Sequence, residues 1–478
     1  MANLDRRDFI SLAATLPFAG AARAADSRRP NILFIVADDL GYADLSCYGR
    51  RDISTPNIDR IAKEGVRFVQ GYANSAVCSA TRTALITGRY QYRLRVGLEE
   101  PVRDVPGIGL PPQHPTLPSL LKKAGYRTAL VGKWHLGPLP DFDPQRSGYD
   151  HFYGFRGGGV DYYTHTGTTQ QKDFWDGNVP VDKQGYMTDL LGDRAVELVS
   201  SLAPGPFFMS LHFNAPHWPW EPPGDDSESR RLGTRNLFHY DGGSMQIYKQ
   251  MVERMDYQVG RVLAALDSKR LRKDTIVIFT SDNGGERFSD TWPFSGRKTE
   301  LLEGGLRIPA IVRWPGRVAG GRTHEQVNIS MDWMPTLLAA AGVGPDPEYP
   351  MDGMSLLPAL TQNAAPVSRK LFWRYKANWQ RAVRDGDFKL LKIRDNTFLF
   401  NVADDPLERA NLRERRRDLY DRMVRDWNEW NATMLPEVPE STAGSVSGAE
   451  WADHYGATAS KGEVDDLTWP ESPMPSAK

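Results

Sequence analysis

The 478-residue chain has few cysteines, no internal repeat and little net charge. Its two cysteines, Cys47 and Cys78, exclude a disulfide scaffold, although an oxidising compartment would permit one bridge between them. The formal net charge is −1, and no dense block of Lys and Arg occurs. The short basic cluster from Arg413 is typical of a solvated helix face. We therefore expect no nucleic-acid partner and no attraction to an anionic membrane surface.

The chain also lacks an apolar run of about 20 residues, the length that a membrane-spanning helix requires. Arg6 and Arg7 precede a shorter apolar stretch, Phe9 to Gly20, and a small-x-small site ends at Ala24. Residues 1–24 are therefore predicted to be a twin-arginine signal peptide rather than a membrane anchor. The sequence predicts a periplasmic or secreted bacterial protein that crosses the Tat translocase already folded, with any cofactor or modification installed beforehand.

Four apolar segments without alternation are typical of strands buried on both faces of a parallel sheet. They are NILFIV (31–36), RTALVG (127–132), PFFMSLHF (206–213) and TIVIFT (275–280). Polar side chains follow each segment. Because open α/β sheets bind ligands at the carboxyl ends of their strands, we expect these side chains to converge.

Helical segments alternate with the strands, which favours right-handed βαβ units. We expect one helix capped by Thr55 with Pro56 at its first position, one capped by Thr116 and one over 245–267. An α/β catalytic domain is predicted over 28–365, with a large, mostly parallel mixed sheet flanked by helices.

The C-terminal part has a different texture. Residues 366–436 predict a smaller α+β domain on a short antiparallel sheet, with a turn at Asp385-Gly386 and a helix from about Arg413 to Met434. Residues 437–478 are rich in Ser, Gly, Pro and acidic residues, so we expect an extended or mobile tail.

Two sets of polar side chains suggest chemistry. The first offers three carboxylates and one amide carbonyl, a hard oxygen set that suits Ca²⁺ or Mg²⁺ better than zinc: Asp38, Asp39, Asp282 and Asn283. The second suits a compact anion such as sulfate, phosphate or phosphonate: Arg82, Lys133, Lys298, His135 and His217. Each residue taken singly also has a structural interpretation, because acidic residues often cap turns.

Cys78 lies in VCSATRTALITGRY, residues 77–90. A helix that begins near Cys78 would place Arg82 one turn later on the same face, with the positive end of the helix dipole at the cysteine. Such a site favours a nucleophile that attacks an anion. Three interpretations stay open at this point: half of a bridge, a buried small residue or a reactive group.

Several stretches together resemble the type I sulfatases of the arylsulfatase A-like kind, within the alkaline phosphatase superfamily. From about residue 30 to 310 they are NILFIVADDLGYADLSCYG, CSATRTALITGRY, GYRTALVGKWHLG, NAPHWPW, SDNGG and SGRKTELLEGGLRIP, in family order. DWMPTLLAAAG, DGMSLLP and LFNVADDPLERANL extend the likeness to about residue 412.

The resemblance implies a hydrolase of aryl or carbohydrate sulfate monoesters. It implies that a formylglycine-generating enzyme oxidises Cys78 to an aldehyde that hydrates to a geminal diol; the motif it reads, Cys-x-Pro/Ala-x-Arg, has Ala80 at its third position. One Ca²⁺ would be held by Asp38, Asp39, Asp282 and Asn283. Arg82 and Lys133 would steady the diol and His135 would accept its proton. His217 and Lys298 would bind sulfate and assist the leaving group.

The sequence indicates the alcohol part of the substrate less clearly than the sulfate part. GGGVDYYTH and the tryptophans beside His217 form a candidate sugar-stacking or aryl-binding wall, or else core and loop: Asp161, Tyr162, Tyr163, His165, Trp218 and Trp220. Two alternatives to a sulfatase stand. One is a phosphonate monoester or phosphodiester hydrolase of the same superfamily. The other is a non-catalytic binding protein in which Cys78 pairs with Cys47.

Overall fold

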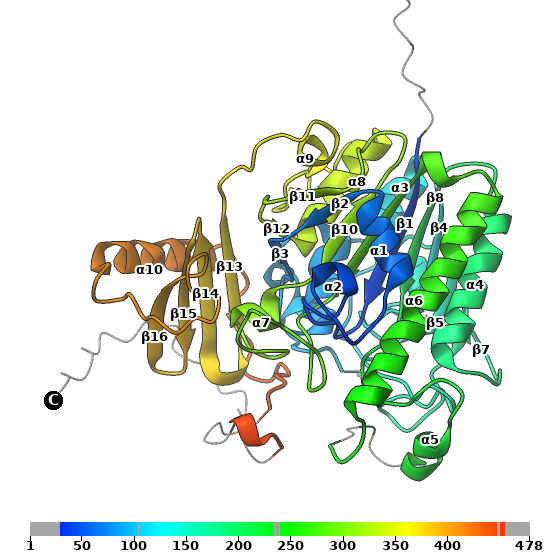
Figure 1. The fold of residues 1–478 in the computed structure, drawn as a ribbon, viewed down its shortest axis with the longest axis horizontal. Helices are drawn as coiled ribbons and strands as arrows, with labels where there is room; N and C mark the ends of the chain where they lie inside the picture. Colours follow the sequence, from blue (N-terminus) through cyan, green and yellow to red (C-terminus); the bar gives the residue numbers. More distant parts are fainter. Residues whose placement is uncertain (1–28, 104–105, 234–236, 238–239, 447–449, 455–478) are drawn as a thin grey trace, which may run out of the picture.

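A computed structural model of the chain describes residues 29–103, 106–233, 237, 240–446 and 450–454 (Figure 1). The predicted signal peptide lies outside the described residues, as do 447–449 and 455–478 of the predicted tail. In the described part, none of the helices has the length and apolar character needed to cross a bilayer.

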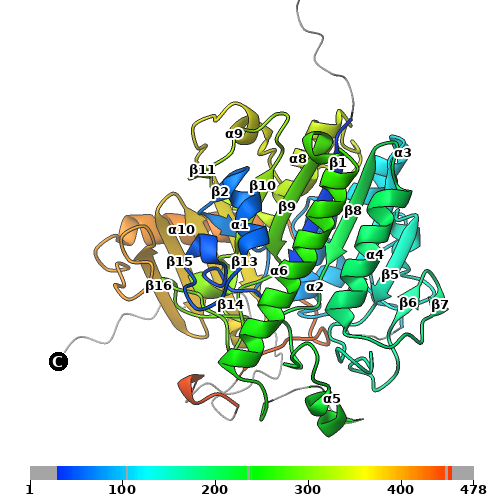
Figure 2. The same ribbon diagram turned by 45° about the vertical axis from the view of Figure 1, so that its right-hand side comes forward.

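A ten-stranded mixed sheet forms the centre of the larger part of the molecule (Figures 1 and 2). Its order is β11-β2-β10-β9-β1-β8-β4-β5-β6-β7, and β9, β1, β8, β4 and β5 run parallel. The strands are β1 (Asn31–Ala37), β2 (Val66–Phe68), β4 (Arg127–Lys133), β5 (His151–Phe155), β6 (Trp175–Asp176), β7 (Val179–Pro180), β8 (Phe207–His212), β9 (Thr275–Ser281), β10 (Ala310–Arg313) and β11 (Arg322–His324). The four predicted strands are the neighbours β9, β1, β8 and β4, so the predicted fold class is confirmed.

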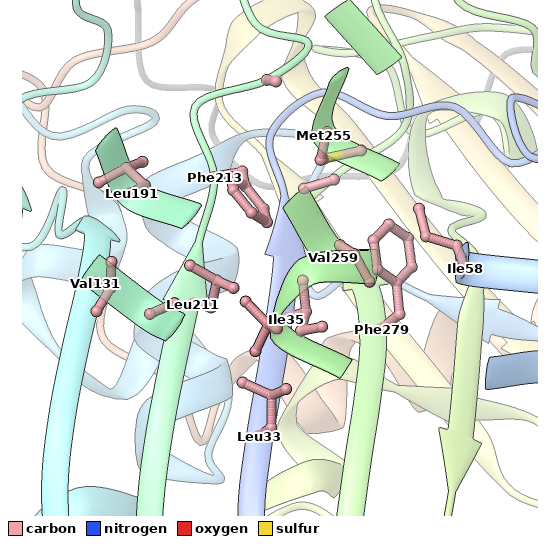
Figure 3. Close-up of a cluster of buried hydrophobic side chains, with 14 of the residues drawn as sticks. Leu33, Ile35, Ile58, Val131, Leu191, Leu211, Phe213, Met255, Val259 and Phe279 are labelled. Atoms are coloured by element: carbon pink, nitrogen blue, oxygen red, sulfur yellow. The ribbon is translucent and has the colours of Figure 1, made fainter. Parts of the chain in front are cut away.

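The central strand β1 is buried along its whole length, which explains its continuous apolar sequence. Successive side chains of a strand point to opposite faces of the sheet. Leu33 and Ile35 pack with Met255 and Val259 on one face (Figure 3), whereas Phe34 lies in the cluster on the other face. Both faces of the sheet therefore need a helical layer.

Helices supply these two layers (Figure 2). One face is covered by α1 (Pro56–Lys63), α4 (Met187–Ser201) and α6 (Met245–Ser268). The other face is covered by α2 (Cys78–Thr87), α3 (Leu117–Lys123), α8 (Trp333–Ala341) and α9 (Leu357–Thr361). Two short helices, α5 (Ser227–Leu232) and α7 (Glu303–Leu306), lie in connecting segments.

One helix is capped by a residue next to it in the sequence and another by a residue from a distant segment. Thr116 accepts a hydrogen bond from Ser119 N at 3.2 Å in a capping box, as the sequence predicts. Thr55 makes no such cap. Instead Asp256 of α6 accepts hydrogen bonds from Asn57 N at 3.1 Å and Ile58 N at 2.8 Å. The prediction that Thr55 caps α1 is therefore wrong, because a carboxylate from a neighbouring helix takes that role.

A second, four-stranded antiparallel sheet follows in the order β13-β14-β15-β16. Its strands are β13 (Lys370–Tyr375), β14 (Gln380–Asp385), β15 (Phe388–Ile393) and β16 (Asn396–Asn401), and α10 (Arg417–Asn431) packs on one face. Asp385 pairs with Phe388, so the predicted turn is a two-residue loop of Gly386 and Asp387. The two remaining strands, β3 (Gly71–Tyr72) and β12 (Asn328–Ile329), pair with each other.

Candidate functional site

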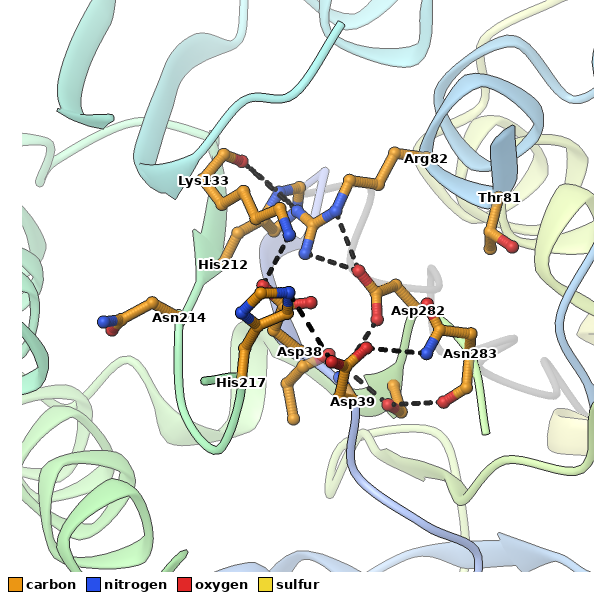
Figure 4. A network of polar contacts seen from close by, with 12 residues as sticks. Asp38, Asp39, Thr81, Arg82, Lys133, His212, Asn214, His217, Asp282 and Asn283 are labelled. Atoms are coloured by element: carbon orange, nitrogen blue, oxygen red, sulfur yellow. Dashed lines mark hydrogen bonds and ion pairs between the residues drawn. The ribbon is translucent and has the colours of Figure 1, made fainter. Parts of the chain in front are cut away.

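The carboxyl ends of the parallel strands bring the predicted site residues together (Figure 4). Ala37 of β1 and Ser281 of β9 are in register, so Asp38 and Asp282, which follow them, emerge side by side. The chain after β8 adds His217, and β4 ends at Lys133. All of the predicted metal-ligand and cationic side chains at this edge are buried: Asp38, Asp39, Asp282, Asn283, Arg82, Lys133, His135, His217 and Lys298.

Each carboxylate of this strand-end cluster has a cationic partner. Lys133 Nζ lies 2.6 Å from Asp38 Oδ2, and Lys298 Nζ lies 2.6 Å from Asp39 Oδ2. Arg82 approaches Asp282 Oδ2 to 2.8 Å. Because the three carboxylates and three cations balance, a divalent cation added here would leave the site positive and suited to an anion.

Close contact between strands places Lys133. Gly132 has φ 113°, and a Cβ there would lie 1.8 Å from His212 O. Only glycine allows this approach of β4 to β8. Arg82 Nη1 donates to Lys133 O at 3.2 Å and lies 3.2 Å from His212 Nδ1, so His212 helps to hold Arg82. Sequence reasoning missed His212, although it lies within the predicted strand 206–213 and ends β8.

Cys78 is the first residue of α2, and Val77 before it offers no side-chain cap. Its thiol lies close to the carboxylates, because one oxygen each of Asp38 and Asp282 and the Cys78 sulfur are all within 4.8 Å of one another. Cys47 and Cys78 are both free, so the Cys47–Cys78 bridge is not formed. Burial raises the pKa of the Cys78 thiol, although Lys133 and Lys298 oppose this. The unmodified side chain is therefore a poor source of thiolate.

The backbone is strained at two of these residues. Asp39 has φ 64° and His135 has φ 57°, both in the left-handed region. Such residues cost roughly 1–3 kcal/mol and persist where the surrounding contacts hold them. The strain is consistent with side chains that are aimed at a site rather than relaxed.

The oxygen donors fit a divalent metal ion. Burial, together with neighbouring Asp282 and Asp39, raises the pKa of Asp38, and Lys133 opposes this rise. Burial also disfavours the charged form of Asp39, but Lys298, with Lys133, lowers its pKa to about 2. Asp38 Oδ1 and Asn283 Oδ1 are buried without a hydrogen-bond partner. A hard cation between these oxygens would satisfy both and relieve the repulsion among the carboxylates.

The two histidines present different nitrogens to the site. His135 Nε2 lies 2.9 Å from Val102 O, which makes it the protonated nitrogen, and Nδ1 is buried without a partner. His217 Nδ1 lies 2.6 Å from Trp218 O, and Nε2 lies 3.6 Å from Asp39 Oδ2. Burial lowers the pKa of both rings, assisted by Lys133 at His135 and by Lys298 at His217. Both are therefore neutral in this arrangement.

A cavity of about 480 Å³ opens onto the cluster, within the range of small-molecule sites. Its lining includes Cys78, Val102, His135, His217, Trp218, Trp220, Tyr240, Glu286, Arg287, Lys298 and Thr442–Val446.

The candidate wall residues separate into two groups. Trp218 and Trp220 line the cavity. Asp161, Tyr162, Tyr163 and His165 do not. Asp161 accepts a hydrogen bond from Ser229 Oγ, and the hydroxyl groups of Tyr162 and Tyr163 donate to the carbonyls of His217 and Pro222. His165 Nε2 contacts Gly185 O. These four residues thus support the loops behind the cavity.

Sequence reasoning missed other parts of the lining. Glu286 and Arg287 follow SDNGG directly, so extending the strand-end argument by two residues would have found them. Tyr240 and residues 442–446 carry no local signal, because only the folded chain brings them to the cavity.

Comparison with known proteins gives matches over most of the chain. Residues 30–343 match the family profile described as Sulfatase, and residues 296–429 match N-sulphoglucosamine sulphohydrolase, C-terminal. The chain is 32% identical over 401 residues to N-acetylgalactosamine-6-sulfatase of Canis lupus familiaris, covering 78% of this chain and 74% of that protein. It is 34% identical over 391 residues to arylsulfatase A of Homo sapiens, covering 75% and 73%.

Among solved structures, the crystal structure of Ps i-CgsB in complex with k-i-k-neocarrahexaose is similar to this fold. The TM-score is 0.78 at 29% sequence identity, and the match covers 89% of this chain and 98% of that chain.

Proposed function

The chain belongs to the sulfatase family, whose members hydrolyse sulfate esters, and on that premise we propose that its reacting centre is Cys78 matured to formylglycine beside a Ca²⁺. The observation that carries this proposal is the meeting of the Cys78 sulfur with Asp38 and Asp282 oxygens within 4.8 Å. Asp38, Asp39, Asp282 and Asn283 would hold the metal, which would supply positive charge to the sulfuryl oxygens.

Hydrated formylglycine would supply an oxygen nucleophile with a second hydroxyl for releasing sulfate. Arg82 is fixed by Asp282 and Lys133 by Asp38, and both would hold this group and the sulfate in place. The first turn of α2, with no side-chain cap, would add its amides to the stabilisation of an anion.

His135 is suited to accept a proton. Its Nε2–H is engaged by Val102 O, so the unpartnered Nδ1 carries the lone pair. Because burial and Lys133 lower the pKa of His135, the ring is neutral and can take the proton of the second hydroxyl.

His217 and Lys298 would act on the sulfate and on the departing alcohol. Asp39 and other anionic neighbours raise the pKa of Lys298 in spite of burial, so its ammonium keeps its charge next to the sulfate. His217 Nε2 is the nitrogen that faces the cluster, and it would have to be protonated to assist a poor leaving group.

The alcohol would lie against Trp218, since a flat aromatic face binds sugar or aryl rings. The names of the relatives include both a carbohydrate sulfatase and an arylsulfatase. An aryl or carbohydrate sulfate is therefore the proposed substrate.

Maturation would follow from the sequence. A formylglycine-generating enzyme would read Cys78, Ala80 and Arg82 in the unfolded chain. The Tat translocase would then export the folded, modified protein to the periplasm or beyond.

Parallel assays test the proposal against a phosphonate monoester or phosphodiester hydrolase. Purified protein is given 4-nitrophenyl sulfate and 4-nitrophenyl phenylphosphonate, with Cys78→Ala as the control. We expect faster release from the sulfate, with inorganic sulfate formed in equal amount, and no turnover by Cys78→Ala. Faster release from the phosphonate would favour the alternative.

A further inference from the structure

The chain beyond α10 returns to the cavity. Residues 437–446, which we call the C-terminal strap, contribute Thr442, Ala443, Gly444, Ser445 and Val446 to the lining. The matched family profile ends at residue 429, so the strap lies outside it. A segment expected to be an extended or mobile tail is thus one wall of the site.

The catalytic part holds the strap from one side. Glu99, which is 3% exposed, accepts hydrogen bonds from Thr442 N and Thr442 Oγ1, both at 2.8 Å. Gly444 N donates to Glu100 O at 2.6 Å, and Glu100 N donates to Thr442 O at 3.1 Å. These bonds fix the backbone of the residues that line the cavity.

The second sheet also holds the strap. Lys376 follows β13 and is 3% exposed. Its ammonium donates to Val438 O at 2.9 Å, Pro439 O at 2.7 Å and Ser441 O at 2.7 Å. Tyr375 donates its hydroxyl hydrogen to Gly444 O at 2.6 Å. Because charge-assisted bonds are the stronger ones, Lys376 is the principal anchor of a segment without helix or strand support.

The chain returns a second time beside Lys298. Arg297 lies 2.7 Å from Asp453, and His454 Nε2 lies 2.9 Å from Glu300 Oε1. Contacts of the C-terminal segment therefore reach both the strap side of the cavity and the loop that carries Lys298.

We propose that the C-terminal strap is a specificity-determining wall that binds the alcohol portion of the sulfate ester, with Lys376 as its positioning residue. The inference rests on the proposed function. Lys376 does not line the cavity, so it acts only through the strap. The strap residues Ala443, Gly444 and Ser445 have small side chains, which leaves space for a ring-shaped alcohol. The strap should therefore affect binding of the alcohol and leave binding of sulfate alone.

The test compares two probes of different reach. 4-Methylumbelliferyl sulfate has a fused-ring alcohol that would extend toward the strap. Inorganic sulfate has no alcohol part, so its constant for competitive inhibition measures binding at the strand-end cluster alone. Lys376→Met should raise KM for the ester about tenfold and leave the inhibition constant of inorganic sulfate within about twofold. Hydrogen exchange in 437–446 should become faster. Lys376→Arg should restore part of the affinity.

Lys370→Met is the matched control, because Lys370 lies in β13 and its ammonium pairs with Asp426 at 2.7 Å on the surface. We expect it to change neither constant. Ala443→Trp changes the wall directly and tests the same inference if Lys376→Met folds poorly; it should raise KM for the ester with the inhibition constant kept.

The outcomes separate the two proposals. An unchanged KM in Lys376→Met with a loosened strap, or in Ala443→Trp, would overturn the inference that the strap binds the alcohol. A parallel change of KM and of the inhibition constant would show that Lys376 supports the whole site. Failure of the wild-type protein to hydrolyse any sulfate ester would instead remove the proposed function on which the inference rests.

Discussion

Two of the buried charge clusters in the described part of the chain differ in how their oxygens are used. In the strand-end cluster, Asp38 Oδ1 and Asn283 Oδ1 have no hydrogen-bond partner, and Lys298 lines the cavity. In the second, which we call the junction cluster, Glu303 accepts from Tyr72 and pairs with Arg307, both at 2.6 Å.

The junction cluster is completed by Lys389, whose ammonium lies 3.0 Å from Glu303 and 2.9 Å from Glu408. It joins β15 to the segment around α7, and its members do not line the cavity described above. Both clusters pair carboxylates with cations away from water. Buried charge alone therefore does not identify a site; oxygens without a partner, next to residues such as Cys78 and Lys298 that line a cavity, do.

The largest effects are expected from substitutions that break each of the two clusters in turn. Asp282→Ala should lower turnover of an aryl sulfate by about 100- to 1000-fold or more, because it removes a proposed metal ligand and leaves Arg82 uncompensated. Lys389→Met should instead lower the free energy of unfolding by about 3–5 kcal/mol and keep turnover per folded molecule. Urea unfolding and active-site-normalised kcat measure the two effects.

Metal removal sharpens the same contrast. Chelation should inactivate the wild-type protein, with Ca²⁺ restoring activity better than Zn²⁺, and should leave the junction cluster unaffected. Full activity of protein shown to be free of metal would contradict the assignment of Asp38, Asp39, Asp282 and Asn283 as ligands.

The third prediction concerns the two cysteines. Trypsin should release FVQGYANSAVCSATR, residues 68–82, and in active protein this peptide should lack the cysteine sulfur, react with hydrazines and resist thiol alkylation. Cys78→Ala should be folded and inactive. Cys47→Ala should keep most activity, since Cys47 lies away from the cavity.

Mass spectrometry of the tryptic peptide decides the matter without knowledge of the natural substrate. Fully alkylatable Cys78 in fully active enzyme would overturn the formylglycine mechanism and leave the fold unchanged.

The fourth prediction compares leaving groups. His217→Ala should slow alkyl sulfates about tenfold or more relative to nitrophenyl sulfates, because an activated phenolate departs without a proton. Steady-state kcat/KM for the two classes measures the difference. An equal loss on both would assign His217 to sulfate binding alone.

The smallest effect is expected at Glu221, a buried carboxyl that lies beside Asp161 instead of a cation. Burial, with Asp161, raises the pKa of Glu221 well above its usual value. Since the folded-state pKa exceeds the unfolded one, its stabilising contribution is complete below the unfolded value of about 4.5 and is lost as the pH rises toward the folded value.

Glu221→Gln should therefore raise the melting temperature by a few degrees at pH 8 and by less at pH 5. Tyr162 N, which donates to Glu221 Oε2 at 2.8 Å, would keep an acceptor in the glutamine. Equal changes at both pH values would show that the carboxyl is not the titrating group.

The sequence by itself determined the parts of the protein whose cause is local. Strands 31–37 and 275–281 could be predicted because burial on both faces requires an unbroken apolar run. The strand-end side chains Asp38 and Asp282 followed, because parallel strands end at a common edge. The start of α3 was also predictable, since Thr116 and Ser119 are close in sequence.

Only the tertiary structure decided features that join distant segments. Asp256 replaces Thr55 as the cap of α1 across 199 residues, and Glu99 meets Thr442 across 343 residues. In neither contact does the local sequence around one residue indicate which distant residue it will meet. Long-range packing also separates the aromatic candidates. Trp218 lines the cavity, whereas Tyr162 lies in the interior, although the sequence around each residue fits either position. The type of a side chain limits the chemistry that it can perform, but long-range packing determines whether it lies in the cavity or in the interior.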